Sequence, residues 1–267
     1  MRRPAGQAPV QPAARHRWVS AGMDAAVTLL LWTYFTLGFL VLFSPFYLLA
    51  FLFARRRHSA FQHLNHYFYR GFFLLCRLLI PQHVWRIDDA VSAIRSSVIV
   101  CNHASYIDPL LMIALYPHHT TLVKNRLFHL PIFGWMLKTA GYLPSTGEDR
   151  LASLMLDRMD TLCRDLARGA NLFVFPEGTR SRNGAIGEFH PGAFKIARMC
   201  RAPICVVLIR NTEKLFTPGR FRFNTRRANT ISVELLATIT PPYGAPGFSI
   251  AGLKDDVRGL MDTRLRF

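Results

Sequence analysis

The chain has 267 residues, which is enough for one sizeable domain with a buried core and a smaller appended segment. Apolar residues make up 51% and charged residues 18%, a composition that excludes a disordered tail and a fibrous repeat. The formal net charge of +17 favours anionic partners, such as anionic lipid, nucleic acid or an acidic carrier protein.

The amino-terminal third is predicted to attach the chain to a membrane. Residues 1–22 form a basic tail, and residues 23–84 are predicted to be membrane-anchoring helices. Within them, residues 25–54 carry no charge, and one straight helix of that length would span about 45 Å against a hydrocarbon core of about 30 Å. A buried helix of a soluble protein is the alternative. A secretory signal peptide fits poorly because its apolar region is shorter.

The course of this segment follows from its proline and its flanks. Ser44-Pro45 falls past the middle, where proline removes a helical hydrogen bond and predicts a break. Arginines lie on both sides of the apolar run, so charge does not favour either orientation across the membrane. We therefore expect a broken or re-entrant pair of helices whose two ends return to the cytoplasmic face.

A second apolar stretch, residues 67–80, carries Arg70 and Arg77 on one helical face. This pattern is typical of a helix in the membrane interface with its arginines toward headgroups. An amphipathic helix packed on the soluble domain explains the pattern equally well. Pro81 ends the helix in either case.

Residues 85–267 alternate short β-branched runs with helical patterns. The runs predict buried strands at 97–101, 121–123, 172–175, 204–209 and 231–239. Apolar periodicity predicts helices over 151–166, closed by Gly169, and over 192–199. Residues 241–252 are expected to form a loop before a short terminal helix. This order predicts an α/β fold in which helices flank a mostly buried sheet.

The cysteines and paired histidines do not form a metal-binding pattern. The cysteines are odd in number and scattered, which predicts reduced core residues and neither a disulfide framework nor a zinc ribbon: Cys76, Cys101, Cys163, Cys200 and Cys205. The histidine pairs at 63 and 66 and at 118 and 119 lack a cysteine or carboxylate partner at ligand spacing. We expect them to face the surface or lipid headgroups.

The first chemical motif follows the strand predicted at 97–101. It runs from Asn102 through His103 to Asp108 and Pro109, so a histidine and an aspartate meet at a strand end and a helix start. Histidine can take a proton from an alcohol, and a nearby carboxylate can fix its tautomer. Alternatively, Asp108 caps a helix that has proline at its first position, and His103 is an unpartnered loop residue.

The second motif, Phe175 to Ser181, follows the strand predicted at 172–175. Gly178 lets backbone amides approach an anion, Thr179 supplies a hydroxyl group, and the guanidinium of Arg180 matches phosphate. A tight turn in which Glu177 and Arg180 pair with each other is the alternative. Together the two motifs favour chemistry on a phosphorylated substrate.

The two motifs, NHASYID at 102–108 and FPEGTRS at 175–181, resemble those of the lysophosphatidic acid acyltransferase family of glycerolipid acyltransferases. The order and the gap of about seventy residues also fit. Three further stretches, 124–134, 189–194 and 202–207, resemble other family blocks, although Arg126 replaces a usual glutamate. The resemblance covers roughly residues 85–215.

The resemblance implies a mixed, glycerol-phosphate acyltransferase-like sheet in an acyltransferase domain over 85–267. It also implies transfer of a fatty acyl group from acyl-carrier protein or acyl-CoA to a lysolipid hydroxyl, without a metal or redox cofactor. His103 is then the base and Asp108 orients its ring. The implied substrate-binding residues are Asn102, Lys124, Glu177, Gly178, Thr179 and Arg180.

One block departs from the family pattern and leaves the acceptor open. The family has an arginine six residues after the glycine at 141, whereas this chain has Gly147, and the nearest basic residues are Lys138 and Arg150. The acceptor expected from the resemblance is lysophosphatidic acid, giving phosphatidic acid in phospholipid synthesis. Another lysolipid, such as lyso-ornithine lipid, is the alternative.

Two expectations on partners and location complete the sequence prediction. A non-catalytic, basic, membrane-anchored protein that binds lipid or nucleic acid is a further alternative, but no nucleic-acid-binding motif is evident, so no nucleic-acid partner is expected. The expected location is the cytoplasmic face of a bacterial inner membrane. The excess of arginine over lysine, 28 to 5, suggests a GC-rich bacterial genome.

Overall fold

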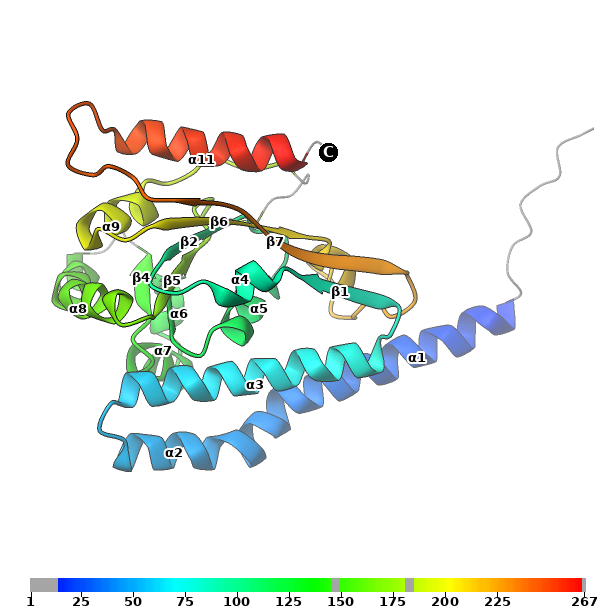
Figure 1. Cartoon of the computed structure of the whole chain (residues 1–267). Helices are drawn as coiled ribbons and strands as arrows, with labels where there is room; N and C mark the ends of the chain where they lie inside the picture. Colours follow the sequence, from blue (N-terminus) through cyan, green and yellow to red (C-terminus); the bar gives the residue numbers. More distant parts are fainter. Residues whose placement is uncertain (1–13, 146–148, 181–184, 266–267) are drawn as a thin grey trace, which may run out of the picture.

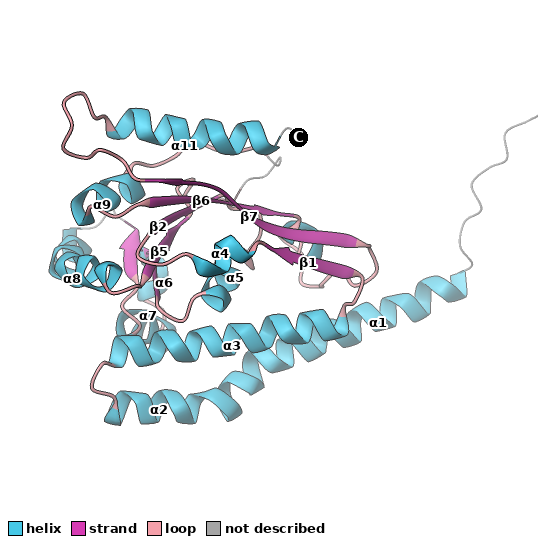
Figure 2. Ribbon diagram, viewed as in Figure 1, coloured by secondary structure: helices cyan, strands magenta, loops and turns pink. Residues whose placement is uncertain are grey.

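The computed structural model describes residues 14–145, 149–180 and 185–265, without the side chains of 14–21 and 149–157. Its centre is one sheet with helices on both faces, and a long amino-terminal helical segment lies along one side (Figures 1 and 2). The predicted class, α/β with a helix-flanked sheet behind an apolar helical segment, is therefore confirmed.

The sheet has seven strands in the order β1-β7-β6-β2-β5-β3-β4. It is mixed, because β7 runs antiparallel to β6 while every other neighbouring pair is parallel. The strands are β1 (His83–Ile87), β2 (Val98–Cys101), β3 (His119–Lys124), β4 (Leu143–Ser145), β5 (Asn171–Val174), β6 (Ile204–Arg210) and β7 (Asn229–Ile239).

All five predicted strands are present, and two were missed. The missed strands, β1 and β4, are the two edge strands and have only five and three residues. β1 also crosses the expected boundary between residues 84 and 85, so the sheet begins inside the segment assigned to the anchor.

Both helices predicted from apolar periodicity, over 151–166 and 192–199, are present. The helices are α1 (Ala14–Thr33), the π-helix η1 (Tyr34–Phe43), α2 (Ser44–Phe53), α3 (Arg57–Leu79), α4 (Asp89–Ala93), α5 (Asp108–Leu115), α6 (Asn125–Phe128), α7 (Phe133–Thr139), α8 (Asp149–Ala167), α9 (Gly192–Cys200), α10 (Thr212–Leu215) and α11 (Ile250–Leu265). Gly169 follows α8 with a φ of 100°, a left-handed conformation that favours glycine.

Two apolar clusters lie on opposite faces of the sheet. Along β2, Ile99 packs on the face toward α3 and α5, while Val98 and Val100 pack on the face covered by α8, α9 and α11. This alternation is the period of two expected of a strand that is buried on both faces. Figure 1 shows α11 and the anchor helices on opposite sides of the sheet.

The apolar amino-terminal segment is one bent helical rod. Residues Gly22–Phe53 form the single helix long and apolar enough to cross a membrane in the part of the chain described, and 11% of its most apolar window is buried. Pro45 lies in the first turn of α2, and the Ser44 amide donates to the carbonyl of Phe39 across the π-helical stretch. Because this wider turn tolerates proline, the rod bends here and does not reverse as expected.

The reversal comes instead at residues 54–56, where α2 turns into α3. α3 packs through Phe61, Phe72 and Cys76 into the core cluster shared with the sheet. Arg70 and Arg77 are exposed, and the Arg77 guanidinium lies 5.4 Å from the ring centre of Trp85. The helix predicted at 67–80 is therefore the end of a longer helix that packs on the α/β domain.

The expectation for the cysteines is correct for three and wrong for two. Cys76, Cys101 and Cys205 are buried and free. Cys163 of α8 and Cys200 of α9 form a disulfide across a separation of 37 residues. Both helices cover the same face of the sheet, and this packing joins two cysteines whose sequence spacing carries no signal.

The expectation that the paired histidines face the surface is wrong for His66 and His119, which are buried. His119 lies in a series of three hydrogen bonds. Asn65 donates to the Tyr142 hydroxyl, and that hydroxyl donates to Nε2 of His119. Nδ1 of His119 in turn donates to the carbonyl of Tyr116. Burial lowers the pKa of His119 to about 3. This network joins the anchor helix α3 to the edge of the sheet.

Candidate active site

Both chemical motifs lie at one edge of the sheet. β2 and β5 are parallel neighbours, with Val100 opposite Val174, so the loops that follow them start side by side. We call residues 102–107 the base loop and residues 175–180 the anion loop. The carboxyl ends of parallel strands are where open α/β sheets bind their ligands.

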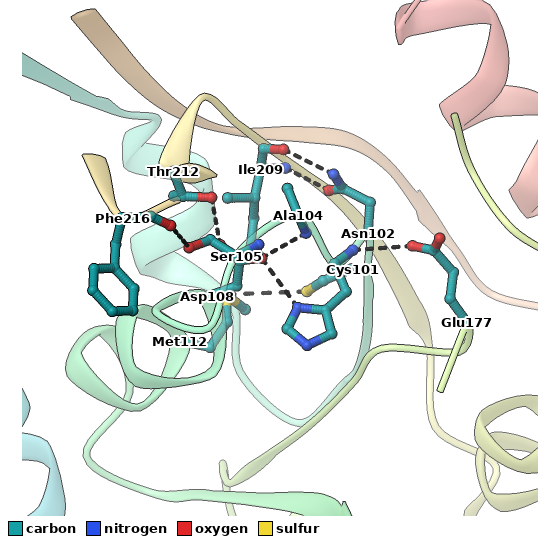
Figure 3. A network of polar contacts seen from close by, with 11 residues as sticks. Cys101, Asn102, Ala104, Ser105, Asp108, Met112, Glu177, Ile209, Thr212 and Phe216 are labelled. Carbon is teal, nitrogen blue, oxygen red and sulfur yellow. Dashed lines mark hydrogen bonds and ion pairs between the residues drawn. The ribbon is translucent and has the colours of Figure 1, made fainter. Parts of the chain in front are cut away.

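The base loop brings His103 and Asp108 together. Nδ1 of His103 lies 3.1 Å from Oδ2 of Asp108, in the network drawn in Figure 3. The imidazole ring stacks at a tilt on Phe175, with 4.5 Å between ring centres. The side chain of Asp108 is fully buried, whereas 16% of the His103 side chain is exposed. A carboxylate is acceptor-only, so Nδ1 carries the proton and Nε2 is left unprotonated.

Asp108 accepts four hydrogen bonds, three on Oδ2 and one on Oδ1. Its Oδ2 also accepts from the amides of Ala104 at 2.7 Å and Ser105 at 2.6 Å, and its Oδ1 accepts from the hydroxyl of Thr212. The carboxylate points back into the base loop and caps no amide of α5, so the capping alternative does not describe it. Such extensive hydrogen bonding is what a buried charge requires.

Asn102 and Glu177 hold the base loop from two sides. The Asn102 side chain exchanges two hydrogen bonds with the backbone of Ile209, at 2.8 and 2.7 Å, which ties the end of β2 to β6. Glu177, which is 7% exposed, accepts from the His103 amide at 3.0 Å (Figure 3). Its other oxygen accepts from the Gly187 amide at 2.9 Å. The side-chain polar groups of both predicted substrate-binding residues are thus hydrogen-bonded to the main chain.

These contacts also use backbone amides near His103. The amides of His103, Ala104 and Ser105 donate to carboxylates, and the Gly178 amide donates to the carbonyl of Phe175. The arrangement described here therefore leaves none of these four amides for an oxyanion.

The anion loop presents the groups expected of it. Gly178 has a φ of 63°, and a Cβ there would lie 3.2 Å from the ring of His190, so a side chain is disfavoured on two grounds. Thr179 is exposed. The Arg180 guanidinium lies 3.4 Å from the ring centre of Tyr106, and its Nη1 is buried and has no hydrogen-bond partner among the described residues. An unpartnered buried guanidinium nitrogen marks a place for an anion.

The remaining predicted residues lie outside the two loops. Lys124 is exposed at the carboxyl end of β3, the edge on which His103 lies. Lys138 lines a cavity that also touches Thr120 and Asn171 near the amino ends of β3 and β5, which is the opposite edge. Gly147 and the side chain of Arg150 lie outside the described residues. Lys138 therefore does not replace the absent arginine beside His103 in this arrangement.

Sequence reasoning missed three residues that shape this site. Thr212 supports Asp108 from a segment 104 residues away, and nothing in its local sequence indicates that contact. Phe175 supports the imidazole and Tyr106 supports the guanidinium. Both aromatic residues lie within the two motifs, but each contacts a residue of the other motif, a pairing that the local sequence does not indicate.

In the part of the chain that the structure describes, no group of three His, Cys, Asp or Glu residues is arranged to hold a metal ion. The expectation of a reaction without a metal or redox cofactor remains a prediction.

Comparisons with known proteins agree with this site. The sequence profile of the family described as Acyltransferase matches residues 83–210, a range that contains both loops. The comparisons support the predicted resemblance to the lysophosphatidic acid acyltransferase family.

Its curated relatives are 1-acyl-sn-glycerol-3-phosphate acyltransferases. The sheep alpha enzyme is 30% identical over 63% of this chain and 58% of its own length. The chloroplastic enzyme of Brassica napus is 31% identical over 46% of this chain and 35% of its own length. The chain thus spans about a third to three fifths of the length of the curated family members it matches.

A solved structure extends the likeness to nearly the whole fold. The 1-acyl-sn-glycerophosphate (LPA) acyltransferase of Thermotoga maritima superposes with a TM-score of 0.69, covering 92% of this chain and 96% of its own. At 20% sequence identity, this similarity supports the fold of the chain and nothing finer.

Proposed function

We propose that this protein transfers a fatty acyl group from a thioester to the free hydroxyl of lysophosphatidic acid, giving phosphatidic acid. The observation that carries the proposal is the orientation of His103. Its Nδ1 is held by a fully buried carboxylate, and its Nε2 makes no hydrogen bond to any described residue. A neutral imidazole fixed in this tautomer is suited to remove a proton from an alcohol.

In the proposed reaction, Nε2 of His103 takes the proton of the acceptor hydroxyl as its oxygen attacks the thioester carbonyl. The new C–O bond gives a tetrahedral intermediate, and Asp108 stabilises the imidazolium. When the C–S bond breaks, the imidazolium returns the proton to the departing thiolate. The protein needs no nucleophile of its own, since the acceptor oxygen forms the ester directly.

The anion loop supplies the acceptor's phosphate site in this proposal. Arg180 offers a buried nitrogen to which no described residue hydrogen-bonds, Thr179 an exposed hydroxyl, and Gly178 a backbone without a side chain. Glu177 acts as a positioning residue, because both its oxygens already accept from the main chain. Lys124, at the same edge, is a further cation for phosphate or for an acidic donor.

The donor is proposed to be acyl-carrier protein or acyl-CoA, both of which are anionic thioesters. The basic surface attracts either of them and anionic lipid as well. The segment from Gly22 to Phe53 is proposed to enter the bilayer from the cytoplasmic face of a bacterial inner membrane, because its apolar side chains are mostly exposed. A lysolipid then reaches the site, and its product leaves, without crossing water.

A different acceptor is the second candidate, and one observation favours it. Gly147 stands where the family pattern has an arginine, so one cation expected beside the acceptor headgroup is absent. A lysolipid without a phosphomonoester, such as lyso-ornithine lipid, requires less positive charge at that position.

The proposal is tested with the full chain in phospholipid vesicles, given labelled acyl-CoA or acyl-carrier protein. Lysophosphatidic acid and lyso-ornithine lipid are supplied in parallel, with His103→Ala as the control protein. Phosphatidic acid formed only by the wild type supports both the base and the acceptor. Transfer to lyso-ornithine lipid alone keeps the mechanism and changes the acceptor. No transfer to either acceptor by vesicle-bound protein favours a binding role.

A further inference from the structure

The turn between α6 and α7 and the first turn of α7, together residues 129–136, expose a cluster of large apolar side chains. Leu130 is 48% exposed, Ile132 73%, Phe133 40% and Trp135 43%. Single exposed apolar residues are ordinary, but four within six positions form a patch that requires a partner. We call this segment the α6–α7 turn.

The backbone conformation that exposes this patch is strained. Ile132 has a φ of 62°, a left-handed conformation that β-branched residues rarely adopt, and its side chain faces solvent. Gly134 passes so close to Phe128 that a Cβ would lie 2.2 Å from the Phe128 carbonyl oxygen. A tight contact thus fixes the turn, and the strained residue is the most exposed member of the patch.

The patch is continuous with the face of the anchor. The Trp135 ring lies edge-on to Phe51 of α2, with 5.1 Å between ring centres, and 5.5 Å from Phe61 of α3. Leu48, Leu52 and Phe53 of α2 are also exposed. Figure 1 shows α7 beside α2 and α3, while α11 lies beyond the sheet.

The charge around the turn suits an anionic surface. Residues 109–147 contain no aspartate or glutamate, whereas Lys124, Arg126 and Lys138 flank the turn and are exposed. Apolar residues bordered by cations are the pattern of a segment that lies in the lipid interface.

We propose that the α6–α7 turn inserts into the membrane interface beside α2, as a second lipid contact separate from the amino-terminal anchor. The inference rests on the membrane attachment included in the proposed function and goes beyond it. α6 begins directly after the carboxyl end of β3, at the edge of the sheet that carries the base loop. The turn and the adjacent α2 together bring that edge to the bilayer, so that a lysolipid can enter the site laterally.

The test places an environment-sensitive fluorophore on single introduced cysteines of the full chain. The native cysteines do not compete, because Cys76, Cys101 and Cys205 are buried and the other two are bonded to each other. The sites are Ile132→Cys on the turn, Leu48→Cys on α2 and Leu260→Cys on α11, all exposed in the folded chain. Leu260 is the matched control, since α11 covers the opposite face of the sheet.

Each labelled protein is bound to vesicles of phosphatidylglycerol and phosphatidylcholine, with and without brominated acyl chains. We expect blue-shifted emission and strong bromine quenching at 132 and 48, and neither change at 260. Quenching at 48 without quenching at 132 would overturn this inference and leave the anchor intact. Absence of quenching at both sites would overturn the membrane proposal as well. Leu130→Cys repeats the measurement if Ile132→Cys does not fold.

Discussion

The base loop and the anion loop follow two adjacent strands, β2 and β5, but they differ in whether their polar groups are hydrogen-bonded within the chain. In the base loop, the amides of His103, Ala104 and Ser105 and both oxygens of Asp108 are hydrogen-bonded within the chain. In the anion loop, Thr179 is exposed, and Nη1 of Arg180 is buried without a partner in the described part of the chain. The first loop is complete without ligand, and the second has open hydrogen-bonding capacity.

The difference indicates how the two loops divide the work. A proton acceptor must already be in the correct tautomer and direction when the substrate arrives, which requires a closed network. A binding group must keep hydrogen-bonding capacity for the ligand, which requires an open one. Changes to the hydrogen-bond network that holds His103, which includes Glu177, should therefore lower kcat. Changes at Thr179, at Arg180 or at the Tyr106 ring beneath Arg180 should raise the KM for the acceptor.

The largest expected effect comes from His103→Gln. The glutamine side chain cannot accept the proton of the hydroxyl group, so kcat should fall by about 10²- to 10⁴-fold. Rates of acyl transfer at saturating donor and acceptor measure this loss. The circular dichroism spectrum and vesicle binding should match those of the wild type. Activity within a few-fold of wild type would remove His103 from the role of base.

Asp108→Asn should break the closed network in two ways. The amide cannot accept all four hydrogen bonds or stabilise the imidazolium, so kcat should fall by about 10²-fold or more. Donors left unpaired in a buried site should also lower the free energy of unfolding by about 1–3 kcal/mol. Urea unfolding measures that loss. Asp256→Asn, at an exposed position of α11, serves as the matched control and should change neither quantity.

Tyr106→Ala should affect the open loop only. Loss of the ring beneath the Arg180 guanidinium removes about 0.5–2 kcal/mol of cation–π stabilisation, which corresponds to an acceptor KM about 2- to 30-fold higher. Tyr106→Phe keeps the ring and should behave as the wild type. If the phenylalanine variant is as impaired as the alanine variant, the hydroxyl group matters and the stacking account fails.

The smallest expected effect concerns the hydrogen bonds around His119, and it changes the stability of the fold only at acidic pH. The pKa of His119 is about 3 in the folded chain and near its ordinary value in the unfolded chain. The unfolded state therefore binds more protons as the pH falls below about 6.5, and the folded state loses stability between there and about pH 3. His119→Asn should flatten the decline of melting temperature with pH. If the melting temperature of His119→Asn declines with falling pH as steeply as that of the wild type, other groups cause the acid sensitivity.

The sequence was most informative where the chemistry is local. His103 and Asp108 are five residues apart across a strand end and a helix start, so their pairing follows from the course of the chain. Gly178 and Arg180 were predictable for the same reason. The five strands that were found are the long or central ones, and the two that were missed are short edge strands with little pattern.

Contacts between distant segments could not be predicted in this way. Glu177 looks like a phosphate ligand in sequence, and only the fold shows that its oxygens face the His103 and Gly187 amides. Thr212 reaches Asp108 because β6 lies beside β2. The bond between Cys163 and Cys200 depends on the packing of α8 and α9, which no spacing rule encodes.

The most direct test of this division compares Glu177→Gln with Arg180→Lys in full saturation curves for the acceptor, measured in the same vesicles at saturating donor. The account predicts that Glu177→Gln lowers kcat with little change in KM, because the carboxylate positions the His103 amide. It predicts that Arg180→Lys raises KM with little change in kcat, because lysine lacks the planar fork of arginine. The reverse pattern, with Glu177→Gln raising KM and Arg180→Lys lowering kcat, would contradict it.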